Sequence, residues 1–226
     1  MHQRLNRSTI TSLALLSLAI LFSSSAFADN GKLEPTGAFA ASGASDALKK
    51  VLEPKGHRVT LSDGTVLCEI WLSTAVTAGK NDAQGAGYTW LPESTLVAVI
   101  TFPADSIDFR KQGIKAGSYT LRSALNPVDG NHLGISPIRD FLLLTPVAAD
   151  PDPNTKYKFD DLITMSKKTT GSNHPSPLSL VSPDGISAWP SVFEDENRHL
   201  VFAAKVKTGS STESPVAFVI KGVAEQ

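Results

Sequence analysis

The side chains best suited to metal chemistry gather in a polar segment at residues 126–140. Asp129 and His132 lie within this segment, Asp140 closes it, and His174 sits in a second Asn-His pair further along the chain. Imidazole nitrogens and carboxylate oxygens together suit Zn²⁺, Cu²⁺, Ni²⁺ or Fe²⁺, and three protein ligands would leave one position open. The four residues therefore define one hypothesis, a site for a divalent transition metal that serves binding or catalysis.

The same segment also has a structural interpretation, which the sequence leaves open. Asp129 and Gly130 form a typical turn pair, and asparagine and histidine are comfortable in turns. Arg139 and Asp140 would then form an ion pair with each other. No motif of the His-Glu-x-x-His type gives these side chains an established ligand spacing.

Residues 150–161 contain a second pattern, in which oxygen-bearing side chains have the spacing of a calcium loop. Asp150, Asp152, Asn154 and Asp161 occupy its first, third, fifth and twelfth positions. Thr155 stands at the sixth position, where such a loop needs glycine, and two prolines stiffen the stretch. We therefore favour the alternative that an acidic, proline-bent segment leads into a helix and caps it.

A group of aromatic residues suggests a ligand-binding surface of a different class. Trp71 shares a predicted strand face with Glu69, and Tyr88 and Trp90 stand two residues apart after a glycine-rich loop. An exposed aromatic ring beside a carboxylate can stack on a sugar or hold a peptide. The alternative is that the tryptophans, including Trp189, fill the core.

Other classes of function have little support in the sequence. Nucleophilic hydrolysis lacks a Gly-x-Ser-x-Gly elbow, and neither a phosphate-cradling glycine loop nor a haem-attachment motif is present. The formal net charge is only −1 at pH 7. Nucleic acid and anionic membrane surfaces both require a basic patch, so the composition argues against them as partners.

Residues 1–28 have the three zones of a secretory signal peptide. Arg4 and Arg7 form a positive start, residues 10–22 are apolar, and Ala26-Phe27-Ala28 supplies the small residues that a signal peptidase requires. We predict cleavage after Ala28 and no membrane span in the remaining chain. Residues 29–45, rich in Gly, Ala and Ser, are predicted to be a flexible tether, and residues 46–226 a single domain.

Most of that domain has the pattern of β-strands. Residues 57–61 and 65–72 read as a hairpin around Asp63-Gly64, and residues 140–147 as a strand covered on both faces. Cys68 is then a small buried hydrophobe, and as the sole cysteine it excludes an internal disulfide. Further strands are predicted at residues 94–102, 107–110, 118–125, 177–181, 188–193, 198–207 and 215–222. We expect a mainly β fold, a β-sandwich or jelly-roll of roughly 8–10 strands with one helix near residues 159–168.

One strand-turn-strand element carries a family resemblance. Residues 100–107 are followed by Gly113-Ile114-Lys115-Ala116-Gly117-Ser118-Tyr119-Thr120-Leu121. This element resembles one found in exported bacterial proteins that are grouped under a domain of unknown function. The resemblance covers about a tenth of the chain, implies a secreted β-sandwich and implies no activity.

Taken together, these patterns favour an exported, periplasmic or secreted module that binds a partner without catalysis. The partner would be a small molecule, a glycan or another envelope protein. The metal-binding or metal-dependent protein built on residues 126–140 and 171–175 remains the alternative.

Overall fold

The computed structural model describes residues 31–74, 76–128, 138–209 and 212–224. Within these ranges the chain forms three antiparallel sheets of seven, three and two strands. In the described part of the chain, no helix combines the length and the apolar composition needed to cross a membrane. The predicted leader at residues 1–28 lies outside the described residues.

The large sheet is a meander, because its strands are neighbours in nearly the order in which they occur along the chain. Its order is β1 (Lys32–Thr36), β2 (Gly56–Thr60), β3 (Val66–Leu72), β4 (Leu96–Phe102), β7 (Gly117–Leu125), β8 (Asp140–Pro146) and β9 (Pro177–Ser179). The small sheet consists of β10 (Ser191–Glu194), β11 (Leu200–Lys207) and β12 (Glu213–Lys221). A short hairpin of β5 (Ser106–Ile107) and β6 (Gly113–Ile114) is inserted between β4 and β7, and the helices are α1 (Asp46–Lys50), the 3₁₀ turn η1 (Val147–Ala149) and α2 (Phe159–Thr170).

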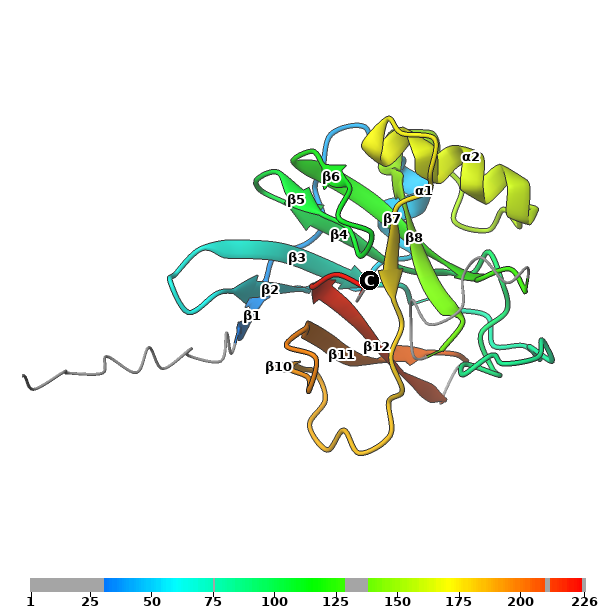
Figure 1. Ribbon diagram of the computed structural model, residues 1–226. Coiled ribbons are helices and arrows are strands. Elements are labelled where there is room, and N and C mark those ends of the chain that lie inside the picture. The colour runs from blue at the N-terminus through cyan, green and yellow to red at the C-terminus, as the bar shows by residue number, and fades with distance from the viewer. Residues whose placement is uncertain (1–30, 75, 129–137, 210–211, 225–226) are drawn as a thin grey trace, which may run out of the picture.

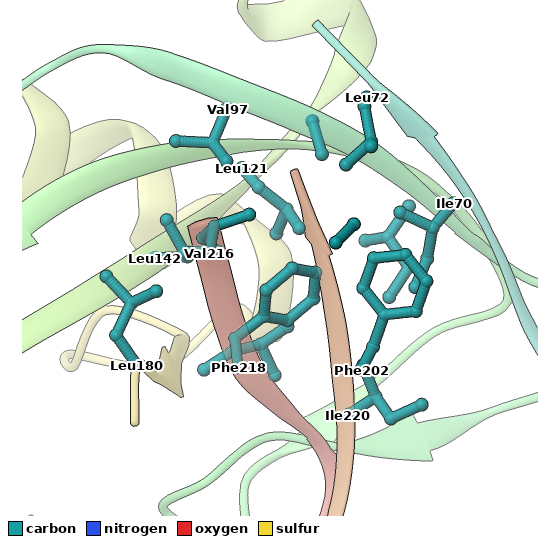
Figure 2. Packing of buried hydrophobic residues seen from close by; sticks show 14 of the residues in the cluster. Ile70, Leu72, Val97, Leu121, Leu142, Leu180, Phe202, Val216, Phe218 and Ile220 are labelled. Atoms are coloured by element: carbon teal, nitrogen blue, oxygen red, sulfur yellow. The ribbon is translucent and has the colours of Figure 1, made fainter. Parts of the chain in front are cut away.

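The two larger sheets pack face to face, and the helices cover the outer face of the large sheet (Figure 1). Figure 2 shows Leu121 and Leu142 of the large sheet meeting Phe202 and Phe218 of the small sheet. All four side chains are fully buried. The prediction of a mainly β fold is confirmed, and the arrangement is that of a sandwich.

Alternation along the central strands explains why both faces of the large sheet are buried. On β8, Leu142 and Leu144 belong to the core between the sheets, whereas Phe141 and Leu143 belong to clusters on the outer side. The prediction of a strand covered on both faces is therefore confirmed for β8. Cys68 is fully buried in the core between the sheets.

The sequence signals at the ends of α2 agree with the observed helix. Asp160 and Asp161 lie in its first turn, and Lys167 and Lys168 lie in its last, where each charge complements the helix dipole. Gly171 ends the helix in the left-handed region with φ of 67°, and its N–H donates to the carbonyl of Lys167.

The structure differs from the flexible tether that the sequence predicts for residues 29–45. Residues Lys32–Thr36 form β1, which pairs with β2 along its whole length. Phe39 is 7% exposed and packs on Trp71, with their ring centroids 5.1 Å apart. Much of this segment is therefore part of the folded domain, which the low-complexity composition conceals.

Candidate functional site

Of the four predicted metal ligands, Asp129 and His132 lie outside the described residues. Asp140 is buried, and its carboxylate accepts hydrogen bonds from the backbone N–H groups of Gly87 (2.6 Å) and Tyr88 (3.3 Å). Burial raises the pKa of Asp140 above its usual value. In the ranges that the structure describes, no three His, Cys, Asp or Glu side chains are grouped to hold a metal ion.

Asp140 and Tyr88 were predicted for two different sites, but they are neighbours in one hydrogen-bonded network. We call the part of this network around the Tyr88 hydroxyl the Tyr88 latch. The Tyr88 hydroxyl donates to the carbonyl of Val181 (2.6 Å) and accepts from the N–H of Ala217 (3.0 Å). This is where the two sheets join, because Val181 N–H donates to the Ala217 carbonyl. Burial raises the pKa of the Tyr88 phenol. Trp90 is half-buried against the same core, with its ring centroid 6.2 Å from that of Tyr88.

Trp71 and Glu69 share one strand face, as predicted, but that face is covered by other parts of the chain. Trp71 is 4% exposed, and its Nε1 donates to the carbonyl of Gly37 at 2.8 Å. Glu69 accepts hydrogen bonds from Thr36 (3.0 Å) and from Arg58 (2.8 Å). The structure thus places Trp71 and Tyr88 in the interior and does not form an open aromatic platform from them.

The segment with the calcium-like pattern, residues 150–161, is bound to the side chain of Arg122, a cation of the protein itself. Asp150 is fully buried and forms a two-point ion pair with Arg122, through Nε (2.6 Å) and Nη2 (2.9 Å). Thr120 and Tyr157 also donate hydroxyl hydrogen bonds to Asp150. A paired carboxylate with four donors is a structural anchor, which agrees with the interpretation as a lead-in to α2. The predicted cap does not form, because the N-cap residue of α2, Lys158, makes no side-chain capping hydrogen bond.

Arg122 also organises the backbone around this anchor. Its Nη1 donates to the carbonyls of Ser94 (2.7 Å) and Thr155 (3.0 Å), and its Nη2 donates to that of Asp152 (2.8 Å). All five N–H groups of the guanidinium therefore have acceptors. The Tyr157 ring lies 4.9 Å from the guanidinium carbon.

A groove beside α2 has a volume of about 670 Å³. We call it the α2 groove. Ala124 of β7 and Phe141 and Leu143 of β8 line it from the sheet, and Phe159 and Ile163 line it from the helix. Figure 1 shows α2 lying along the outer face of the sheet at β7 and β8. The groove is thus a space between two layers of the fold, which neither layer fills.

Two loops held together by hydrogen bonds form one side of the α2 groove. Gln112 donates to the carbonyl of Pro175 at 2.8 Å and accepts from the Ser172 hydroxyl at 2.6 Å. The Phe109 N–H donates to the carbonyl of Pro177 at 3.0 Å. His174 lines the groove from the second loop, so this predicted residue does belong to a cavity.

The C-terminal segment is fixed against the same side. Ala224 lines the groove, and its N–H donates to the carbonyl of Phe109 at 2.9 Å. His199 holds this segment, since its Nε2 lies 3.0 Å from the Val223 carbonyl and its Nδ1 lies 3.3 Å from Asp195. These contacts give the groove a fixed wall.

Comparison of the chain with protein-family models, with curated proteins and with solved structures finds no match. The α2 groove is therefore identified by its geometry alone. Of the residues that line it, only His174 was predicted from the sequence as a site residue. The other lining residues come from separate segments, and each is an ordinary core or loop residue in its own segment.

Proposed function

We propose that this protein is an exported, periplasmic or secreted binding module without catalytic activity, and that the α2 groove is its ligand site. The observation that carries the proposal is a cavity of about 670 Å³ lined mainly by apolar side chains. Ligand pockets of proteins have volumes of roughly 300–1,000 Å³, mostly apolar walls and a few polar groups. The leader pattern of residues 1–28 supports export.

The apolar walls favour a small molecule with a hydrocarbon or aromatic body over a glycan. Phe109, Phe141 and Leu143 are each 4% exposed, so their positions are set by packing before a ligand arrives. Phe159 and Ile163 are only half-buried and would lose more water contact on binding. Burial of such surface stabilises a complex by about 25 cal/mol per Å² before the costs of association.

The experiment uses a neutral apolar probe, N-phenyl-1-naphthylamine, whose fluorescence rises in a dry site. Protein lacking the leader should bind it with a saturable signal. Ile163→Trp fills the groove and should weaken binding by about tenfold or more, as expected when a pocket is occluded. Thr164→Trp is the matched control, because Thr164 is the next residue on α2, is exposed and does not line the groove.

Equal binding by both variants would overturn the assignment of the ligand site to this groove. Far-UV and near-UV circular dichroism of the variants would show that each has kept the native fold. Absence of saturable binding in the parent protein would overturn the proposed site as a receptor for apolar molecules.

A further inference from the structure

The α2 groove is not uniform in charge, because one part of its wall carries cationic side chains. Arg110 and Lys111 come from the loop between β5 and β6, and Lys167 comes from the last turn of α2. Lys167 lies two turns after Phe159 on the helix, about 12 Å further along its axis. These three side chains are the cationic region of the groove, and its member on α2 lies apart from the apolar start of the helix.

The cationic residues come from segments that are joined to each other. The loop with Arg110 and Lys111 is bound to residues 172–177 through Gln112 and Phe109. Residues 172–177 directly follow the C-terminus of α2, where Lys167 lies. Packing and hydrogen bonding therefore hold the three cations around the same cavity.

Among the described residues, the charges of this region have no acidic partners. No aspartate or glutamate is among the described residues that line the α2 groove. Arg110, Lys111 and Lys167 form no ion pair with any residue in the described ranges. The acid nearest in sequence to Arg110 and Lys111 is Asp108, which is fully buried and accepts hydrogen bonds from the Arg110 and Gln112 N–H groups. These bonds hold its carboxylate within the loop.

We propose that the α2 groove binds a monomeric amphipathic carboxylate, with the hydrocarbon body against Phe159 and Ile163 and the anionic head at Arg110, Lys111 and Lys167. This inference rests on the proposed function, and it adds the class of ligand. A carboxylate pairs well with a guanidinium and with ammonium groups. An apolar cavity lined by three cations, with no acid among its described lining residues, offers groups for both ends of such a molecule.

The test compares dodecanoate with 1-dodecanol, two chains of equal length that differ in the charge of the head group. Binding is measured by displacement of N-phenyl-1-naphthylamine, below the concentrations at which either compound aggregates. We expect dodecanoate to bind about tenfold more tightly than 1-dodecanol, since two or three partly exposed charge pairs favour it. The Arg110→Gln, Lys167→Gln variant should remove that preference and leave 1-dodecanol binding unchanged.

Lys168→Gln is the matched control, because Lys168 is adjacent to Lys167 on α2 and does not line the groove. It should leave the preference for dodecanoate intact. Equal binding of the two compounds to the parent protein would overturn the carboxylate inference and leave the apolar site standing. Loss of probe binding altogether would overturn the proposed function instead.

Two further outcomes identify other occupants and would also overturn the inference. Stronger association with phosphatidylglycerol vesicles than with monomeric dodecanoate would show that the cations meet a membrane surface. A dimer in light scattering that dissociates when dodecanoate is added would show that a second copy of the chain covers the groove.

Discussion

Two sets of cations, one on the large sheet and one around the α2 groove, differ in their surroundings. Arg122 is 1% exposed, and each of its N–H groups has an acceptor on Asp150 or on a backbone carbonyl. Arg110, Lys111 and Lys167 instead surround an open groove and form no ion pair within the described ranges. The first arrangement suits stability, and the second leaves charge available to a ligand.

The anchor and the groove are close in the fold, and the same strand contributes to both. Arg122 and Ala124 stand two residues apart on β7, so their side chains project from the same face of the sheet. Leu162 of α2 packs on Ala124, while the segment before the helix is held by Arg122. The anchor therefore fixes the start of α2, and the helix in turn forms one wall of the groove.

The largest effect is expected from Arg122→Met, which leaves the Asp150 carboxylate buried without its cation. Breaking a buried ion pair in this way should lower the free energy of unfolding by about 3–5 kcal/mol, measured by urea denaturation. The double variant Arg122→Met, Asp150→Leu should recover part of that loss. A loss below about 1 kcal/mol in the single variant would show that the pair contributes no more than a weak surface ion pair. Arg122 would then not differ in its contribution to stability from the cations of the α2 groove.

A smaller loss is expected from Tyr88→Phe, which removes one hydroxyl from the junction of the sheets. The Ala217 N–H would lose its partner on Tyr88, and the Val181 carbonyl would lose the donor that Tyr88 supplies. We expect the free energy of unfolding to fall by about 1–3 kcal/mol. Tyr119→Phe is the control, since the Tyr119 hydroxyl donates to the carbonyl of Lys115, four residues away, and should matter less. Equal losses in both variants would contradict the latch.

Asp140 is a second buried carboxyl that can be compared with Asp150. It is held mainly by backbone N–H groups, whereas Asp150 is held by the Arg122 guanidinium. Burial raises its pKa in the folded protein. The folded state thus holds this proton more tightly than the unfolded chain, whose aspartates titrate near about 3.9. The resulting stabilisation is complete below the unfolded pKa and is lost as pH rises through the folded pKa.

Asp140→Asn should therefore destabilise the protein more in acid than at neutral pH. Urea denaturation of the parent and the variant from about pH 3.5 to pH 7 gives the difference in free energy of unfolding at each pH. A difference that grows with rising pH would contradict the direction of this pKa shift.

The smallest effect on stability is expected at the groove itself. Lys167→Glu and Lys168→Glu both place a negative charge in the last turn of α2, which costs about 0.3–1 kcal/mol through the helix dipole. We expect equal losses of unfolding free energy in the two variants, although only Lys167 lines the groove. A much larger loss for Lys167→Glu would show that this lysine supports the fold, as Arg122 does.

Local signals in the sequence were sufficient for the elements that depend on neighbouring residues. The Asp63-Gly64 turn forms as predicted, with Gly64 at φ of 86° and the Thr65 N–H donating to the Asp63 carboxylate. The helix was predicted at residues 159–168 and extends to Thr170. In both cases the turn or cap chemistry lies within a few residues of the element that it defines.

Features that depend on distant partners were not predicted. The charged, proline-containing Lys32–Thr36 is a strand because β2 pairs with it, and no local pattern indicates that pairing. Arg122 was not singled out, since nothing in the sequence indicates that Asp150, and not another acid, is its partner. The α2 groove combines residues from the sheet, the helix and several loops, so it exists only once the topology is known.

The meander order of the large sheet also bears on the sequence of events during folding. Apart from the inserted β5–β6 hairpin, each ladder joins two strands that are consecutive along the chain. Pairing can therefore proceed from the N-terminal end as the chain becomes available. The Tyr88 latch is different, because it joins residues 129 positions apart and needs β12 in place. We therefore expect the large sheet to assemble early and the closing of the sandwich to be the slow, late step.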